Sequence, residues 1–146
     1  FDGDDYYLYV YKKAEKIATA VYMITDFFGD SEPLKTNMRT AALCLIDMSL
    51  SFNTTSVSDR KDLLSNVIRD SLSIVSYSEI ATLAGIESTM NHRILKSELE
   101  NFIKTIEDRE NPQNLGRHFV LSEDVIKDDL PTPTPRPLTG QSIYTG

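Results

Sequence analysis

Hydrophobic residues recur along the first half of the chain at the spacing of amphipathic helices. In residues 6–29 and again in residues 34–52, apolar side chains repeat at alternating intervals of four and three. These positions are Val10, Ala14, Ile17, Val21, Ile24 and Phe28, then Leu34, Met38, Ala41, Leu45, Met48 and Phe52. The intervals predict two helices with one buried face each. Because only a few residues join the helices, we expect them to pack antiparallel.

Residues between these two stretches suggest where the helices end and begin. Gly29 follows the last apolar residue of the first stretch, which predicts a left-handed C-terminal cap there. Ser31 is the predicted N-cap of the second helix, and Pro33 fits its first turn because the missing N–H has no helical partner at that position.

Two more helices follow a Ser- and Thr-rich loop. The third is predicted to start at Ser56 or Ser58 and to end or bend at Gly85, and serines such as Ser78 let neighbouring helices approach closely. A fourth helix starts near Ser88 and stops before Pro112. The sequence therefore predicts an all-α, up-down-up-down antiparallel four-helix bundle over residues 1–110.

The last 36 residues differ in composition from the bundle. Residues 111–146 are predicted to be an irregular, extended tail in which two alternatives stay open, a short helix over 123–129 or an extended stretch over 118–121. Pro131, Pro133, Pro135 and Pro137 favour polyproline II or an unordered chain after residue 128. We expect the tail to make partner contacts through four apolar anchors, which are Leu130, Leu138, Ile143 and Tyr144.

Net charge, hydropathy and cysteine content indicate which partners and which cellular compartment to expect. The formal charge of −7 disfavours a nucleic-acid surface, because phosphate binding needs clustered Lys and Arg. No apolar run is long enough to cross a bilayer, so no membrane contact is expected. A single cysteine, Cys44, fits a reducing compartment and predicts a cytoplasmic protein; its flanking leucines predict a buried structural thiol.

Reactive side chains are few. The two histidines, His92 and His118, are far apart in sequence, and neither has an acidic residue three positions before it, as a di-iron bundle requires. His92, near a helix start, is predicted to be a solvated surface residue. The sequence shows no phosphate loop and no nucleophile elbow. We therefore expect no cofactor, no metal and no enzymatic activity.

One cluster near the N-terminus combines lysines with tyrosines. Nucleobases stack on aromatic rings and phosphates pair with lysines, so a nucleic-acid contact is one interpretation of this cluster. The other interpretation, which the acidic total favours, is a solvated helix face with tyrosines at the rim of the bundle. The candidate contact residues are Tyr9, Lys12, Lys13 and Lys16.

Three segments carry a resemblance to known proteins. Tyr11–Lys16, Glu32–Lys35 and Met90–Lys96 resemble the helix starts of a family of uncharacterised bacterial four-helix-bundle proteins, over about residues 6–110. Longer members of that family carry a C-terminal winged-helix region, which this chain does not show. More remotely, the bundle looks like the four-helix accessory proteins of retroelements. The resemblance implies the bundle fold and a regulatory setting.

These observations favour a non-enzymatic interaction or assembly module. We expect it to form a homo-oligomer or to dock on a protein partner through the faces of the bundle and the tail. The alternative is the dimerisation part of a nucleic-acid-associated regulator, either transcriptional or a retroelement accessory protein.

Overall fold

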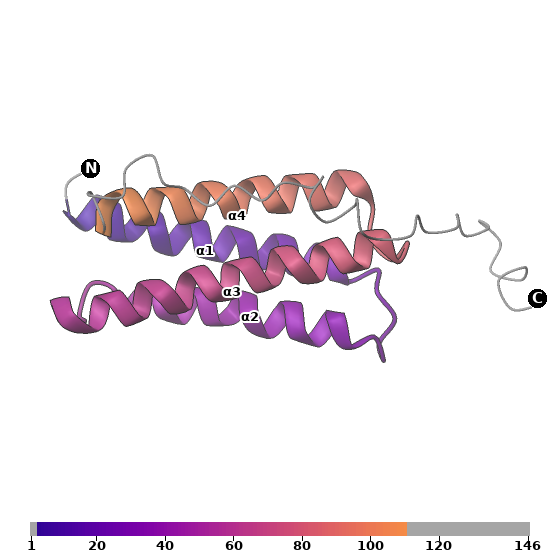
Figure 1. Ribbon diagram of the computed structural model, residues 1–146, viewed down its shortest axis with the longest axis horizontal. Coiled ribbons are helices and arrows are strands. Elements are labelled where there is room, and N and C mark those ends of the chain that lie inside the picture. Colours follow the sequence, from indigo (N-terminus) through magenta and orange to yellow (C-terminus); the bar gives the residue numbers. More distant parts are fainter. Residues whose placement is uncertain (1–2, 111–146) are drawn as a thin grey trace, which may run out of the picture.

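Four helices follow one another in the computed structural model, which describes residues 3–110. They are α1 (Gly3–Thr25), α2 (Pro33–Ser51), α3 (Val57–Leu83) and α4 (Thr89–Glu110). Each helix packs against the next in sequence, and α4 closes the bundle by packing against α1 (Figure 1). The predicted all-α, up-down-up-down bundle is confirmed. The tail with its candidate helix over 123–129 lies outside the described residues.

The predicted apolar stripes form the core of the bundle. Val10, Ala14, Ile17, Val21 and Phe28 of the first stripe are buried. On α2, Met38, Leu45 and Phe52 are buried, whereas Leu34, Ala41 and Met48 are half-buried against them. The largest fully buried side chains include Tyr6, Phe52 and Phe102. Periodicity thus identified the faces that the helices turn inward.

The prediction of a buried thiol at Cys44 is wrong, because the residue is exposed. Its neighbour Leu45 lies on the buried face of α2, and one residue along a helix rotates the side chain by about 100°. Leu43, on the other side of Cys44 in the sequence, is also exposed, at 45%. Flanking apolar residues are therefore a poor guide to burial within a helix.

Helix α1 ends at Thr25, four residues before Gly29 and earlier than the glycine signal predicts. Gly29 does not adopt a left-handed conformation; among the described residues only Gly85 has a positive φ. After Thr25 the chain turns so that the amide of Phe28 donates to the Thr25 carbonyl at 3.0 Å, and the Phe28 ring enters the core. The predicted cap at Ser31 is also wrong. Glu32 caps α2, and its carboxylate accepts from the Leu34 amide at 3.0 Å.

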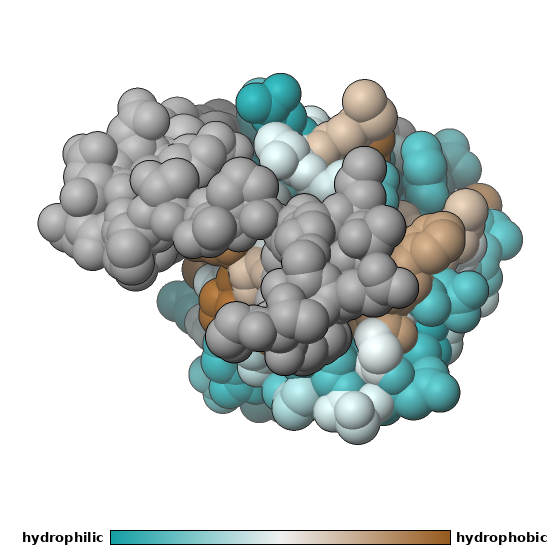
Figure 2. Space-filling model, turned by 90° about the vertical axis from the view of Figure 1, so that its right-hand side faces the viewer, coloured by the Kyte–Doolittle hydropathy of each residue, from teal (hydrophilic) through white to brown (hydrophobic). Residues whose placement is uncertain are grey.

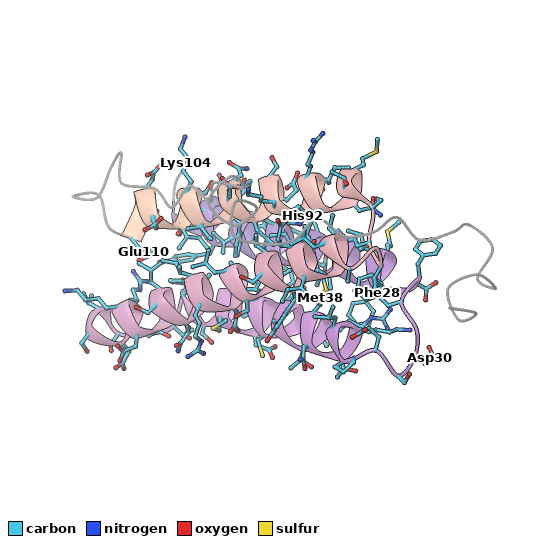
Figure 3. The ribbon with its side chains drawn as sticks, turned by 45° about the vertical axis from the view of Figure 1, so that its right-hand side comes forward. Phe28, Asp30, Met38, His92, Lys104 and Glu110 are labelled. Carbon is cyan, nitrogen blue, oxygen red and sulfur yellow. The ribbon has the colours of Figure 1, made fainter. Side chains whose placement is uncertain are left out.

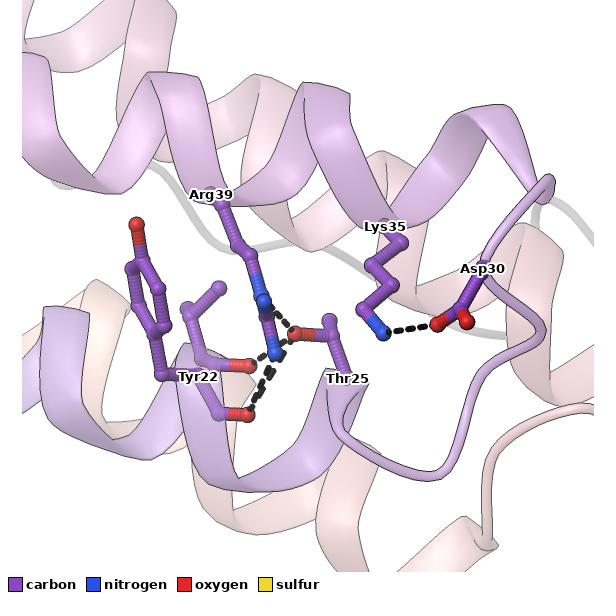
Figure 4. Close-up of polar contacts among 6 residues, drawn as sticks. Tyr22, Thr25, Asp30, Lys35 and Arg39 are labelled. Carbon is purple, nitrogen blue, oxygen red and sulfur yellow. Dashed lines mark hydrogen bonds and ion pairs between the residues drawn. The ribbon is translucent and has the colours of Figure 1, made fainter.

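Arg39 of α2 holds the C-terminal end of α1 (Figure 4). Its Nε donates to Thr25 Oγ1 at 2.8 Å and its Nη2 donates to the Tyr22 carbonyl at 3.1 Å. The guanidinium also lies over the Tyr22 ring, 4.3 Å from its centroid. A cation thus satisfies acceptors at the negative end of the helix dipole, which is its favourable position.

Helix α3 ends in a Schellman motif that reverses the chain into α4. The Gly85 amide donates to the Thr82 carbonyl at 3.1 Å, and the Ile86 amide donates to the Ala81 carbonyl at 2.7 Å. Gly85 has φ = 79°, the left-handed conformation that this motif requires. Ser88 then caps α4, because its Oγ accepts from the Asn91 amide at 3.1 Å. The helix stop predicted at Gly85 and the start predicted near Ser88 are both confirmed.

A pair of glycine substitutions tests this turn. We expect Gly85→Ala to lower the free energy of unfolding by about 1–2 kcal/mol, because a Cβ is strained at positive φ. Gly29→Ala is the matched control, since Gly29 has no positive φ and a Cβ there would meet no atom within 4 Å. Urea denaturation of both variants measures the difference, and equal stabilities would contradict the assigned turn geometry.

Candidate functional site

Four polar side chains form a buried chain of contacts where α3 turns into α4. Glu79 Oε2 lies 2.6 Å from His92 Nε2. On the other side of the imidazole, Nδ1 lies 2.9 Å from Ser78 Oγ. Ser78 Oγ in turn lies 2.5 Å from Glu87 Oε2. We call Ser78, Glu79, Glu87 and His92 the corner network.

The corner network is shielded from water. Ser78 is fully buried, and His92, Glu79 and Glu87 are exposed by 2%, 7% and 7%. Burial raises the pKa of Glu87 to about 7, although the hydrogen bond with Ser78 acts in the opposite direction. The second carboxylate oxygens of Glu79 and Glu87 are buried and have no hydrogen-bond partner among the described residues. A negative charge on Glu87 is therefore costly at this place.

The prediction that His92 is a solvated surface residue is wrong. Figure 3 shows His92 on the inner side of α4, whereas Lys104 points away from the bundle. The sequence does contain a signal for this. His92 precedes Leu95 by three residues and Leu99 by seven, so it continues the buried stripe of α4 by one turn.

The corner network contains the residue types of a serine-hydrolase triad, but not an accessible one. A nucleophile must reach a substrate, and Ser78 has no exposed surface. Its hydroxyl is also held between the imidazole and a second carboxylate. The arrangement can bind and redistribute protons within the core, and it presents no reactive atom to solvent.

A second polar cluster closes the opposite end of the bundle. Arg60 Nη2 of α3 donates to the Tyr7 hydroxyl at 2.5 Å and to the Phe52 carbonyl at 2.8 Å. Its Nη1 lies 3.7 Å from Glu110 Oε2. The Tyr6 hydroxyl donates to Glu110 Oε1 at 3.5 Å, and burial raises the pKa of that phenol. These contacts tie the start of α1 to the end of α4.

The lysine–tyrosine cluster is only partly presented to solvent. Lys12 and Lys16 are exposed, and Lys12 pairs with Glu15 at 3.6 Å. Lys13 instead forms an ion pair with Glu98 of α4, which lowers the pKa of that carboxyl chiefly through the hydrogen bond. Tyr9 packs partly against the core. The structure thus places two of the four candidate nucleic-acid contact residues, Lys12 and Lys16, fully on the surface.

Large apolar side chains are exposed at the end of the bundle where α1 finishes and α4 begins. On the α1 side, Met23 is 67% and Phe27 is 84% exposed. On α4, Met90 is 71% and Ile94 is 53% exposed. Ile94 and Met90 precede Glu98 by four and eight residues, so they continue the helix face that meets α1 through Lys13. We call Met23, Phe27, Met90 and Ile94 the apolar end surface.

Figure 2 looks onto this end of the molecule and shows hydrophobic residues reaching the surface between hydrophilic ones. Single exposed apolar residues are common on soluble proteins, whereas several at one end of a bundle are typical of an interaction site. The predicted tail anchors Leu130, Leu138, Ile143 and Tyr144 lie outside the described residues.

Among residues 3–110, no group of three or more His, Cys, Asp and Glu side chains is arranged to hold a metal ion. None of the four helices there combines the length and apolar character that a membrane span requires.

Comparison of the chain with protein-family models, with curated proteins and with solved structures gives no match.

Proposed function

We propose that the protein is a non-enzymatic interaction module that self-associates through its apolar end surface, with the tail as a second contact. The apolar end surface carries this proposal. Four large apolar side chains are each more than half exposed on adjacent elements at one end of the bundle. Bringing two such surfaces together removes apolar area from water, at about 25 cal/mol per Å².

Polar contacts at the bundle ends support this assignment. Arg39 fixes the end of α1 next to Met23 and Phe27, and the Schellman motif fixes the start of α4 next to Met90. A surface on well-fixed elements loses little conformational freedom on binding, which favours association.

An interaction role also agrees better with the corner network than a catalytic one. The only serine–histidine–carboxylate arrangement we find among residues 3–110 has its hydroxyl fully buried. We place the module in the cytoplasm, on the basis of its single cysteine.

The test of self-association is a charge placed on the apolar end surface. We expect the wild-type protein to form a dimer or larger oligomer at high concentration, and Ile94→Glu to shift it to monomer. The physical reason is that burying an unpaired carboxylate in an apolar interface costs several kcal/mol. Sedimentation velocity over a hundredfold range of concentration measures the change.

Asn101→Glu provides the matched control, because Asn101 is exposed on the same helix about two turns further along. It adds the same charge outside the apolar end surface and should leave the oligomer intact. A wild-type protein that remains monomeric throughout, or an equal effect of both substitutions, would exclude self-association through this surface.

A truncation separates the contribution of the tail. We propose that Leu130, Leu138, Ile143 and Tyr144 add a contact to the same assembly. Deleting residues 129–146 should then weaken the association without changing the thermal unfolding of the bundle. No change in assembly would remove the tail from the proposal and leave the apolar end surface as the only contact.

The second candidate, the dimerisation part of a nucleic-acid-associated regulator, is favoured by one observation, the exposure of Lys12 and Lys16. Fluorescence anisotropy with labelled single-stranded and duplex DNA at low salt tests it. Binding that is lost in the Lys12→Glu/Lys16→Glu double variant would support this candidate, and no binding by the wild type would exclude a contact at this face.

A further inference from the structure

The corner network contains three short polar contacts in series. They join Glu79 to His92, His92 to Ser78, and Ser78 to Glu87, at 2.6, 2.9 and 2.5 Å. Each contact is a hydrogen bond only if one hydrogen lies between its two heavy atoms. The series therefore needs three hydrogens.

The side chains supply only two of these hydrogens when both carboxyls are ionised and the imidazole is neutral. The Ser78 hydroxyl supplies one and the neutral His92 ring supplies the other. One contact is then left with two acceptors facing each other. If the ring carries its proton on Nε2, the contact without a hydrogen is one of the two that Ser78 makes. If the proton is on Nδ1, it is the contact between Glu79 and His92 Nε2.

One additional proton supplies the missing hydrogen, and it can be bound by any of three groups. On His92 it makes both ring nitrogens donors, and Ser78 then donates to Glu87. On Glu87 it lets the carboxyl donate to Ser78, whose hydroxyl then donates to His92 Nδ1. On Glu79 it lets the carboxyl donate to His92 Nε2. The ring then donates from Nδ1–H to Ser78, and Ser78 donates to Glu87. In each case all three contacts become hydrogen bonds.

We propose that the corner network is a proton-dependent latch, which holds the α3–α4 corner closed while it contains one proton beyond the neutral imidazole and the serine hydroxyl. Loss of that proton places two acceptors in contact inside the core. The corner then loses stability, because its oxygen and nitrogen atoms are largely shielded from the water that would replace the missing hydrogen.

Several charged groups on the surrounding elements make their contacts outside the latch. The titratable groups of the latch are Glu79 of α3, Glu87 of the turn and His92 of α4. On α2, Lys35 pairs with Asp30 at 3.1 Å and Arg39 binds the end of α1, while the Glu32 carboxylate caps the helix. Other charged groups at this end are Asp26 of α1 and Arg93 of α4, which are exposed, and Lys96, which is half-buried one turn after His92 on α4.

The direction of the pH effect follows from the burial of Glu87. Its pKa is raised from 4.5 to about 7 in the folded protein, so folding takes up a proton between these values. The contribution to stability is fully present below pH 4.5 and is lost as the pH rises through 7. With a Glu87 pKa of 4.5 in the unfolded chain and about 7 in the folded protein, the folding equilibrium constant falls about thirtyfold between pH 5.5 and 8.5.

Glu87→Gln tests the latch, because the glutamine amide is a permanent donor to Ser78 and supplies the third hydrogen at every pH. Urea denaturation measures the folding equilibrium constant at each pH. We expect its fall between pH 5.5 and 8.5 to be about thirtyfold larger in the wild-type protein than in Glu87→Gln. Titrating groups outside the latch are common to the two proteins and cancel in the difference, whereas His92 and Glu79 belong to the coupled network that the substitution changes. The variant should be the more stable protein at pH 8.5.

Two further variants make the result specific. Glu79→Gln supplies a donor to Nε2 at every pH and should reduce the pH dependence, although Glu87 stays buried. This second variant keeps the test valid if Glu87→Gln does not fold. Glu15→Gln removes an exposed carboxyl on α1 and should keep the wild-type profile. A profile of Glu87→Gln and Glu79→Gln that parallels the wild type would overturn the proposal.

Amide hydrogen exchange shows whether the effect is local. After correction for the intrinsic pH dependence of exchange, the amides of Ile86, Glu87 and His92 should lose protection above pH 7 in the wild type and keep it in Glu87→Gln. These amides donate to Ala81, Ala81 and Ser88 carbonyls in the closed corner. Unchanged protection at all three amides would overturn the assignment of the latch to this corner.

Discussion

Replacing Phe102 with alanine is expected to lower the free energy of unfolding by about 3–5 kcal/mol. The Phe102 ring is fully buried on α4 and belongs to the core in which all four helices meet. Removing it loses the apolar contacts of the ring and leaves a cavity that the four rigid helices cannot fill. A loss of this size is a large part of the stability of a domain this small. Urea denaturation followed by circular dichroism measures it.

The same substitution at Phe27 is the matched control. Phe27 is 84% exposed in the turn after α1, so removing its ring leaves no cavity. At a protein concentration where the chain is monomeric, Phe27→Ala should change the unfolding free energy by less than about 0.5 kcal/mol. Similar losses for the two variants would contradict the burial of Phe102 and the exposure of Phe27.

Replacing His92 with leucine is expected to lower the free energy of unfolding at pH 7 by about 3–5 kcal/mol. Leucine removes the ring nitrogen 2.6 Å from Glu79 and the one 2.9 Å from Ser78. Glu79 then loses its His92 partner inside the core, and a buried carboxylate without a donor is strongly destabilising.

Arg93→Leu controls for the introduction of a leucine at this part of α4. Arg93 is the next residue and is exposed, so the substitution should cost less than about 0.5 kcal/mol. A double variant with Glu87→Gln adds a second check. If the network acts as a unit, the two substitutions should not be additive, because each changes the hydrogen bonds that the other uses. Additive effects would indicate that His92 and Glu87 are energetically independent.

The helices could be predicted from the sequence because their buried faces are regular. Residues such as Val10, Ile17 and Leu45 repeat at the helical period, and burial at that period is the strongest signal that a single sequence carries. Short joints between the stripes then leave few ways to pack the helices. The ends were harder to place, since Glu32 competes with Ser31 as a cap and only one of the two side chains faces the first amides of α2.

The corner network could not be predicted, because it depends on the path of the turn. Glu87 meets Ser78, nine residues earlier, only because the left-handed Gly85 reverses the chain. The sequence indicated Ser78 as a small residue that lets helices approach, not as a bridge between two other polar groups. The sequence predicts a surface position for His92 because it lies near a helix start, although its position continues the stripe of Leu95 and Leu99. Closeness to the helix start and the helical period point to opposite answers, and the period is the better guide.

The contact between Tyr6 and Glu110 places the first and last described helical turns at one end of the bundle (Figure 1). Both ends of the described chain thus lie at one end of the bundle, and the apolar end surface lies at the opposite end. A 22-residue helix spans about 33 Å, which an extended chain covers in roughly ten residues. The segment between Glu110 and Leu130 is longer than this, so the proposed anchors from Leu130 onward are within reach of the opposite end of their own bundle or of a neighbouring one. A reporter domain fused to the N-terminal side of α1 should therefore leave the apolar end surface unobstructed.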